Sequence, residues 1–487
     1  MKIGQTSAVL FVSKVVTSLS GFAATLYFAN VLGAEVLGTY FLLLSAVAWI
    51  TILVDAGVRQ SIIKRMSEQR DPGAYFQVGL LVVAVGVVGI VLALLVLSRP
   101  VTDYVGHPMA TISLVVLVGT GSAVGIVKSG LEGSHKVHVT GMMDISQTLL
   151  RVVLQVSAVL LGSGLVGLVY GWALAATAAA ALGGIVLTSE LQGFPTKRIA
   201  DARRKLQELY SFAKYSWLGS VKSKTNNYAD VLILGLFVPN DLIGIYSVCW
   251  NIASFLTIFG ASISQTLFPE FSQLDQQGDD DEIADLVGKS MQYTGMLVIP
   301  GLFGGALLAE RILRLYGSEF TAGATVLFLL IIAVLVFDYQ KQLTNALAGM
   351  DRPDLDFRVN GIFIGSNVLL NVVLIRLLGW EGAAVATVLS SSLSMVYAYH
   401  TVIRLIDVAV PYREIGYQLL SSVLMSGVVF GMLSVENDAS MIDNNVVVVL
   451  ATVGLGAATY AAVLLVLSGS TRRAVFRNIG VRDRSRH

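Results

Sequence analysis

About fourteen long apolar runs divide this 487-residue chain, and they constrain its fold more than any other feature. A helix that crosses a bilayer needs about 20 mostly apolar residues, and the runs have that length. Only 13% of the chain is charged, against about 25% in soluble domains, so water cannot be the solvent for most of its surface. The sequence predicts an all-α integral membrane protein with transmembrane helices at 8–31, 38–58, 76–98, 110–128, 143–162, 164–188, 212–237, 242–268, 289–309, 322–346, 357–378, 381–403, 414–434 and 445–468.

Lysine and arginine are distributed unevenly between the two sides of these helices. With the N-terminus in the cytoplasm, 25 of the 33 basic residues fall on the cytoplasmic side and four in the outer loops. Because such an excess marks the cytoplasmic side, we expect a multi-pass protein of the plasma or inner membrane with both termini in the cytoplasm. The acidic segment 269–288 departs from this pattern. Acidic residues contribute little to orientation, so we interpret it as a solvated turn.

A weak internal repeat relates the two halves of the chain. Residues 32–40 (LGAEVLGTY) resemble residues 238–246 (VPNDLIGIY) at an offset of 206, and residues 131–133 resemble residues 347–349 at an offset of 216. An even number of predicted helices separates the matching segments, so the repeat is parallel, as in transporters built from two lobes. A general preference for G-x-Y turns is the alternative explanation.

The repeat and the charge pattern together predict five segments. Residues 189–211 are basic and amphipathic, which favours an interfacial helix on an anionic leaflet over a plain solvated linker. The expected order is an N-terminal six-helix lobe (1–188), this cytoplasmic amphipathic connector (189–211), a C-terminal six-helix lobe (212–405), two extra transmembrane helices (406–470) and a basic cytoplasmic tail (471–487).

Several short motifs occur in the order found in one known family. They are Leu32-Gly33-x-Glu35-x-x-Gly38-x-Tyr40, Phe268-Pro269-x-x-Ser272, Tyr316-Gly317-x-Glu319-Phe320, and Asn367-x-x-x-Asn371 followed by Gly379-x-x-Gly382. Through these motifs the chain resembles, over nearly its whole length, the polysaccharide or lipid-linked oligosaccharide flippases (Wzx-type) of the MATE-like MOP superfamily. The resemblance implies the MATE-like fold of this superfamily. It also implies the movement of an undecaprenyl- or dolichol-linked glycan across the bilayer. It does not identify the sugar.

Charged side chains inside the predicted spans are candidates for function, because charge in a bilayer is costly. Arg151 and Lys222 lie roughly 12–15 Å into their helices at 1.5 Å per residue, and a cation at that depth suits a phosphate or pyrophosphate. The structural alternatives are pairs of Arg151 with Asp144 and of Lys222 with Asp230. The predicted substrate-binding candidates are Arg151, Lys222, Lys224, Lys14, Gln147, Gln155, Asn226, Asn367 and Asn371.

Other polar groups in the spans have equally open roles. Lys14 can bind substrate or extend to the membrane surface, and the asparagines can bind sugar hydroxyls or join helices. Asp144, Asp230 and Asp55 are candidates for ion coupling, although Asp55 stands four residues before Arg59, which favours a local ion pair. Asp338 is interpreted in the same way, with Lys341 and Asn345 near it.

These deep charges are net basic, which favours an anionic substrate. We expect a flippase that moves a polyprenyl-phosphate-linked oligosaccharide from the cytoplasmic to the outer leaflet, for cell-surface polysaccharide or glycoprotein synthesis, by alternating access through a cationic central cavity. A peptidoglycan-precursor flippase and a MATE-type exporter are the alternatives, although an exporter of cations predicts an acidic cavity. A membrane glycosyltransferase or polymerase would need catalytic groups on a substantial outer loop, and the outer loops are short.

The sequence predicts neither a catalytic residue nor a metal site nor a cofactor, and coupling to protons or sodium stays open. The single cysteine, Cys249, excludes an intramolecular disulfide and a cysteine-based zinc cluster. The expected partners are the lipid-linked glycan and membrane lipids, with association with glycosyltransferases or a polymerase left open. A net charge of +1 gives no reason to expect nucleic acid, and a monomer is expected.

Overall fold

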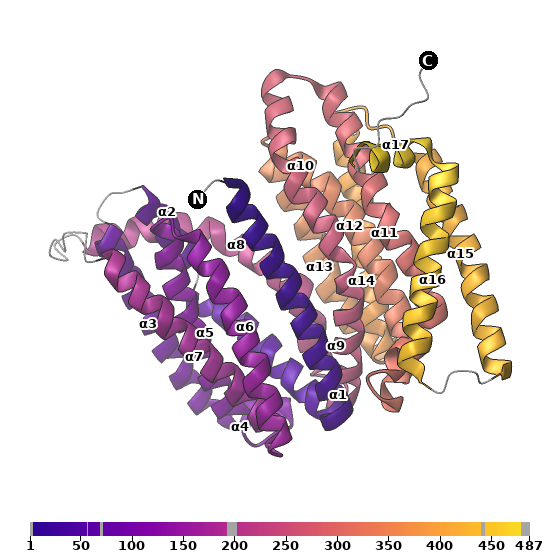
Figure 1. Cartoon of the computed structure of the whole chain (residues 1–487). Helices are drawn as coiled ribbons and strands as arrows, with labels where there is room; N and C mark the ends of the chain where they lie inside the picture. Colours follow the sequence, from indigo (N-terminus) through magenta and orange to yellow (C-terminus); the bar gives the residue numbers. More distant parts are fainter. Residues whose placement is uncertain (1–2, 56, 69–71, 192–201, 440–443, 479–487) are drawn as a thin grey trace. The chain divides into compact units, whose positions relative to one another are not determined.

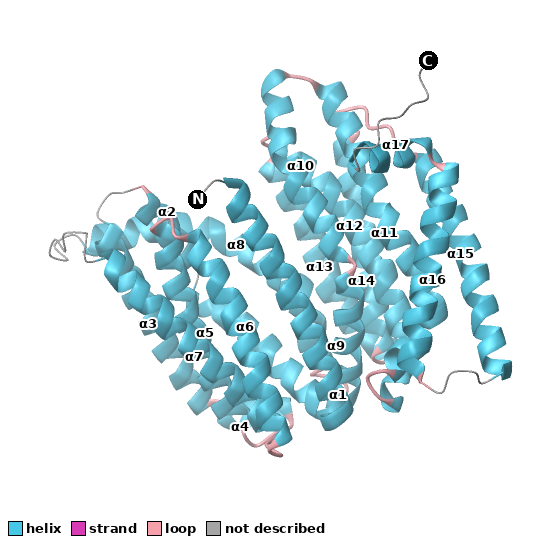
Figure 2. Cartoon of the chain, viewed as in Figure 1, coloured by secondary structure: helices cyan, strands magenta, loops and turns pink. Residues whose placement is uncertain are grey.

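A computed structural model of the chain describes residues 3–55, 57–68, 72–191, 202–439 and 444–478 (Figure 1). These described residues form helices joined by short turns, and none of them forms a strand (Figure 2). Large apolar side chains remain exposed along the helices, for example Leu161 (84% exposed) and Leu377 (72% exposed). Such surfaces are compatible with lipid and not with water. The chain is therefore an all-α, multi-pass integral membrane protein, as predicted.

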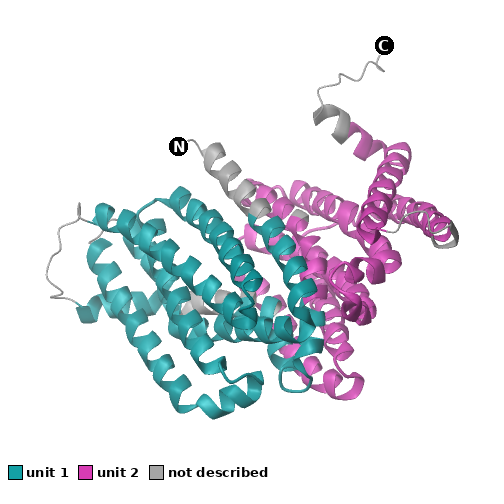
Figure 3. Ribbon diagram, turned by 60° about the horizontal axis from the view of Figure 1, so that its bottom comes forward, with its two compact units in different colours: residues 1–247 teal, residues 248–487 magenta. Residues whose placement is uncertain are grey.

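Packing divides the chain into two compact units, residues 1–247 and 248–487 (Figure 3). The first unit extends past the predicted connector because α8 packs against α1, α2 and α3. The division into two six-helix lobes at 188 and 212 follows the sequence repeat and stays a prediction. Unit 1 contains α1 (Ile3–Asp55), α2 (Val58–Ser67), α3 (Pro72–Val96), α4 (Ser98–Val105), α5 (Ala110–Gly133), α6 (Val137–Leu160), α7 (Gly164–Leu191), α8 (Ala202–Leu234) and the first half of α9 (Asn240–Phe255).

Helix α1 is broken at Gly33, which lies between the first two predicted spans. Gly33 has backbone angles of φ 79° and ψ 175°, which only glycine adopts without strain. The predicted spans 8–31 and 38–58 are therefore the two arms of α1. Eleven described helices are long and apolar enough to cross a bilayer, or twelve if the bent pair α9 and α10 is one span. The predicted count of about fourteen is not confirmed by this criterion, and α8, with Lys214, Lys222 and Lys224, is not among the eleven.

The start of α8 differs from the expected connector. Residues 192–201 lie outside the described part of the chain, and from Ala202 onward the chain forms the first turns of α8 instead of a separate interfacial helix. Lys205 is 4% exposed, with its Nζ 5.7 Å from the centre of the Tyr75 ring. Ser61 Oγ donates a hydrogen bond of 2.9 Å to the Leu209 carbonyl oxygen. These contacts hold the start of α8 against α2 and α3 of its own unit.

Unit 2 carries the second half of α9 and all later helices, and α12 lies at its centre, in contact with α10, α11, α13 and α14. Part of the predicted C-terminal tail forms a short helix, α17. The elements of this unit are α10 (Thr257–Gln277), α11 (Asp280–Arg314), η1 (Ser318–Gly323), α12 (Ala324–Gly349), α13 (Pro353–Leu378), α14 (Glu381–Val402), α15 (Tyr412–Ala439), α16 (Asn445–Leu467) and α17 (Gly469–Asn478).

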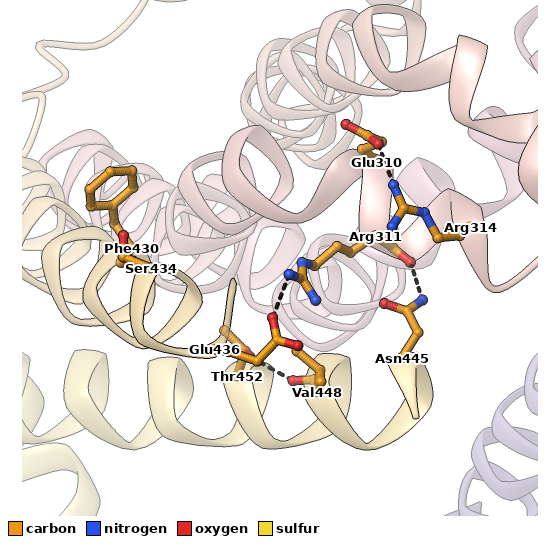
Figure 4. Close-up of polar contacts among 9 residues, drawn as sticks. All are labelled: Glu310, Arg311, Arg314, Phe430, Ser434, Glu436, Asn445, Val448 and Thr452. Atoms are coloured by element: carbon orange, nitrogen blue, oxygen red, sulfur yellow. Dashed lines mark hydrogen bonds and ion pairs between the residues drawn. The ribbon is translucent and has the colours of Figure 1, made fainter. Parts of the chain in front are cut away.

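The two extra helices, α15 and α16, are fixed to α11 near both ends. At one end Arg311 Nη2 lies 2.6 Å from Glu436 Oε2, and Asn445 donates a 3.0 Å hydrogen bond to the Arg311 carbonyl oxygen (Figure 4). At the other end Gln418 donates to the Gln292 carbonyl oxygen at 2.8 Å, and the Gln292 side chain donates to Ser470 Oγ at 3.0 Å. The helix pair is therefore a part of unit 2 and not a loose appendage.

Candidate functional site

Four helices of unit 1, α1, α2, α6 and α8, bring together a group of basic and aromatic side chains. We call this group the basic cluster, and its members are Arg151, Lys224, Arg59, Tyr40 and Tyr228. Arg151 lies on α6, Lys224 and Tyr228 lie on α8, and Tyr40 lies on the second arm of α1. Two of these residues, Arg151 and Lys224, were predicted from the sequence as substrate-binding candidates, and the structure places them in one cluster.

Tyr228 connects the two predicted cations. Its ring centre lies 5.4 Å from Lys224 Nζ, a cation–π contact. The Arg151 guanidinium is within electrostatic range of the phenols of Tyr228 and Tyr40. Arg151 Nε is buried and has no hydrogen-bond partner. A buried donor without a partner is costly, so this guanidinium has unused capacity for an acceptor such as a phosphate oxygen.

The pair of Arg151 with Asp144, which was the structural alternative, is not formed. Asp144, in the N-terminal half of α6, is paired instead with Lys128 of α5. The Asp144 side chain is 52% exposed. Its partner is a lysine from another helix, so the spacing of Asp144 and Arg151 along α6 carried no information about either residue. Asp144 as an ion-coupling residue stays a prediction.

Asp55 and Arg59 form the predicted local ion pair, with Arg59 Nη2 at 2.9 Å from Asp55 Oδ1. Both side chains are largely buried, with 16% of Asp55 and 25% of Arg59 exposed. Lys224 is within electrostatic range of both. The carboxylate of Asp55 is therefore within range of two cations and balances part of the charge of the basic cluster.

Gln155 belongs to the packing beneath the cluster. Its side chain is 2% exposed, and its amide nitrogen donates to Tyr40 Oη at 2.9 Å and to the Leu168 carbonyl oxygen at 2.7 Å. Both amide hydrogens are thus used inside unit 1. In this structure Gln155 donates to Tyr40, whose phenol is within electrostatic range of Arg151. Gln147, about two turns earlier on α6, is half-buried.

The other predicted site residues of unit 1 are only partly described. Asp230 accepts a 2.6 Å hydrogen bond from Tyr246 Oη. The side chains of Lys14, Lys222 and Asn226 lie outside the described residues, so the predicted pair of Lys222 with Asp230 cannot be compared with the structure.

The predicted asparagines of unit 2 lie between two helices. Asn367 of α13 is 2% exposed and its amide nitrogen is 3.3 Å from Thr387 Oγ1 and 3.4 Å from Ser390 Oγ of α14. Asn371 is fully buried and donates to the Asn367 carbonyl oxygen at 2.9 Å. This geometry is that of polar side chains joining two membrane helices, the second of the two roles expected for them.

An apolar cavity of about 240 Å³ lies in unit 2, where α11, α12, α14 and the start of α15 meet. Its walls contain three tyrosine rings and two methionines, and it is partly open. Such a lining suits a hydrocarbon chain and offers little to a sugar. The lining residues are Met291, Tyr339, Met395, Tyr399, Val410, Tyr412 and Ile415.

Sequence analysis missed the aromatic half of the basic cluster. Tyr40 was interpreted as part of a turn motif, and Tyr228 was not considered. A usable signal was present, since Tyr228 follows Lys224 by four residues and so lies on the same helix face. Among the residues that the structure describes, no group of three or more His, Cys, Asp or Glu side chains has the arrangement of a metal site.

Comparison with known proteins gives consistent results. A family model described as polysaccharide biosynthesis protein matches residues 3–275. The chain is 32% identical over 480 residues to the probable flippase AglR of Haloferax volcanii, which covers 97% of this chain and 98% of that protein. It is 26% identical over 446 residues to the probable low-salt glycan biosynthesis flippase Agl15 of the same organism, with 91% and 92% of the two chains covered.

Solved structures share the fold. The lipid II flippase MurJ in an inward closed conformation superimposes with a TM-score of 0.76, covering 97% of this chain and 99% of that one at 13% identity. An inward-facing multidrug resistance MATE transporter of the MOP superfamily gives a TM-score of 0.65, covering 80% and 94% at 13% identity. At these identities the likeness is one of fold.

Proposed function

This chain belongs to the polysaccharide biosynthesis protein family, and from that premise we propose that it is a flippase for a polyprenyl-phosphate-linked oligosaccharide. The substrate would pass from the cytoplasmic to the outer leaflet by alternating access, for the synthesis of a cell-surface polysaccharide or glycoprotein. Two similar proteins over nearly the whole chain, AglR and Agl15, are named as probable flippases, and the name of Agl15 includes glycan biosynthesis.

The observation that carries the proposal is the basic cluster. A polyprenyl-linked glycan has an anionic phosphate or pyrophosphate between its sugar and its lipid. Arg151 offers a guanidinium with an unused buried donor. Lys224 contacts the ring of Tyr228, and the phenol of Tyr228 is within electrostatic range of Arg151. Charge-assisted hydrogen bonds from arginine to phosphate are strong and directional. The same cluster would repel the cationic substrate of a MATE-type exporter, so its positive charge favours the flippase over that alternative.

The apolar cavity of unit 2 supplies a place for the lipid. Its tyrosine and methionine lining would accommodate part of a polyprenyl chain. The cavity lies beside the start of α15, one of the two extra helices, so we propose that these helices help to accommodate the long lipid tail. Membrane lipids, a monomeric state and association with glycosyltransferases or a polymerase complete the proposal.

Replacing Arg151 tests the proposal. In proteoliposomes loaded with a fluorescent polyprenyl-pyrophosphate oligosaccharide, Arg151→Ala should lose a contact worth about 1.5–3 kcal/mol, so translocation should fall roughly 10- to 100-fold. Arg151→Lys keeps the positive charge but loses the two-pronged guanidinium donor, so its translocation rate should fall less. Arg358→Ala, which removes an exposed guanidinium from α13, is the matched control. Unchanged translocation in Arg151→Ala at normal protein level would remove the basic cluster from the mechanism.

The proposed orientation has its own test. The chain has one cysteine, Cys249, which is fully buried and should not react with a polar maleimide. We expect a membrane-impermeant maleimide to label Ser163→Cys, at the turn between α6 and α7, in intact cells. Gln277→Cys, at the end of α10, should be labelled only after permeabilisation, and both positions are exposed. The opposite labelling pattern would invert the topology and make the acidic segment 269–288 external.

A further inference from the structure

Unit 2 contains a carboxylate that neither the basic cluster nor the apolar cavity uses. Asp338 lies in the middle of α12 and is fully buried. Neither Oδ1 nor Oδ2 has a hydrogen-bond partner. This differs from the expected local ion pair with Lys341, since no described group donates a hydrogen bond to the carboxylate.

The carboxylate is packed against the backbone of α10. A methyl group at Gly260 would lie 2.9 Å from Asp338 Cγ, so the glycine leaves the space that the carboxylate occupies. Gln342, one turn after Asp338 on α12, uses its own polar groups elsewhere. Its amide nitrogen donates to the carbonyl oxygens of Gly260 and Asp338 at 3.3 and 3.4 Å, and its Oε1 accepts from Ser264 Oγ at 3.2 Å.

Charged groups around Asp338 are few. Lys341, on α12 itself, is the group within electrostatic range of the carboxylate. The facing part of α10 presents Gly260 and Ser264, neither of which is charged. Within the described part of the chain, these contacts leave Asp338 without a charged partner at ion-pair distance.

The equivalent place in unit 1 is arranged differently. At the repeat offsets, α5 corresponds to α12 and the second arm of α1 corresponds to the α9–α10 region. At the end of the second arm of α1, the carboxylate of Asp55 is paired with Arg59 of α2, whose guanidinium lies against Gly125 of α5. One half of the protein therefore has a compensated acid, and the other half has an acid with no guanidinium.

An ionised carboxylate that is buried without a partner costs many kcal/mol, and such a group takes up a proton instead. A metal cation would need several oxygen ligands, whereas the nearby oxygens of Gly260 and Gln342 already accept hydrogen bonds. We propose that Asp338 is a proton-binding site of unit 2, neutral in this conformation and able to release its proton when α10 and α12 separate. The site does not depend on the proposed substrate.

Infrared spectroscopy of the purified full-length protein tests the protonation directly. The wild type should show the C=O stretch of a buried carboxylic acid at neutral pH, and Asp338→Asn should lack it. Glu310→Gln, which changes an exposed acid that is ion-paired with Arg314, should keep it and is the matched control. A band that is the same in the wild type and in Asp338→Asn would mean that Asp338 is ionised, and the proposal would be overturned.

A stability measurement separates a proton from a sodium ion. If Asp338 is neutral, Asp338→Asn should unfold at nearly the wild-type temperature, and the addition of sodium chloride in place of choline chloride should change neither protein. Stabilisation of the wild type, but not of Asp338→Asn, by sodium would assign the site to that cation and overturn the proposal.

A transport assay tests whether the proton site has a role in coupling. Of the three experiments, this one rests on the proposed function. An imposed pH gradient should stimulate translocation of the fluorescent oligosaccharide by the wild type, and this stimulation should be lost in Asp338→Asn. If neither protein moves the oligosaccharide, the proposed function fails while the infrared result stands. If both proteins respond equally to the gradient, Asp338 has no part in coupling and that role of the proton site is overturned.

Discussion

Replacement of Gly38 with alanine is expected to remove most of the folded protein. Gly38 lies on the second arm of α1, where the start of α9 crosses it. A methyl group at Gly38 would overlap the Asn240 carbonyl oxygen, and one at Gly244 would overlap the Ala34 carbonyl oxygen. Overpacking usually costs about 1–3 kcal/mol, and here two backbones are in contact and neither can yield as a side chain would, so we expect the upper end or more.

The contacts around this crossing explain why the backbone cannot move. Asn240 donates hydrogen bonds of 2.9 Å to Thr39 Oγ1 and to the Val105 carbonyl oxygen. Tyr104 Oη donates to the Leu232 carbonyl oxygen at 2.6 Å, and burial raises the pKa of this phenol. Moving the start of α9 away from α1 and α4 would break both hydrogen bonds of Asn240.

Size-exclusion chromatography and thermal unfolding of fluorescent fusions will measure the effect. Gly119→Ala on α5 is the matched control, because a methyl group there meets nothing within 4 Å. Alanine is the better helix former by about 1 kcal/mol, so this control should be neutral or slightly stabilised. A Gly38→Ala protein that folds and unfolds like Gly119→Ala would show that the close crossing is not required.

Removal of Asp55 should produce the second large effect. Asp55→Ala leaves the Arg59 guanidinium largely buried, with Lys224 nearby and no counter-charge. Loss of one partner of a buried pair costs about 3–5 kcal/mol, and the partial exposure of this pair places the expected loss nearer roughly 2–3 kcal/mol. Thermal unfolding of the purified variant should show a clear fall in the midpoint.

A double variant distinguishes the loss of the ion pair from the loss of side-chain packing. Asp55→Asn with Arg59→Gln removes both charges and keeps the shapes, so it should be more stable than Asp55→Ala. Glu310→Ala, which removes the partner of Arg314 at 2.5 Å from a pair whose side chains are both more than half exposed, should cost little because surface pairs contribute little. If the double variant is no better than Asp55→Ala, the charge of Arg59 is not the cause.

The repeated motif is an instance in which the sequence indicated a feature and the structure supplied its reason. LGAEVLGTY and VPNDLIGIY suggested a repeat with turn glycines. In the structure Gly38 and Gly244, the glycines of the two copies, lie against each other's helix. Each tyrosine then bonds a polar side chain of unit 1, since Tyr40 accepts from Gln155 and Tyr246 donates to Asp230.

The candidate site was predicted in part. Depth within an apolar run identified Arg151 and Lys224, because charge in a span is rare and costly. Spacing within a helix also identified the Asp55–Arg59 pair, since residues four apart are neighbours on one face. It could not identify Lys128 as the partner of Asp144, because that contact joins two helices.

The sequence alone determined that the chain is helical and lies in a membrane, and where most of its helices begin and end. These properties follow from local quantities, the apolar length of a run and the turn residues that break it. Only the tertiary structure decided which charges are compensated. Arg151 meets tyrosines from other helices, Asp55 keeps its arginine, and Asp338 is buried against Gly260 with no partner. A charge in a bilayer is stabilised or destabilised by what lies across the helix interface, and that neighbour is set by packing rather than by position in the chain.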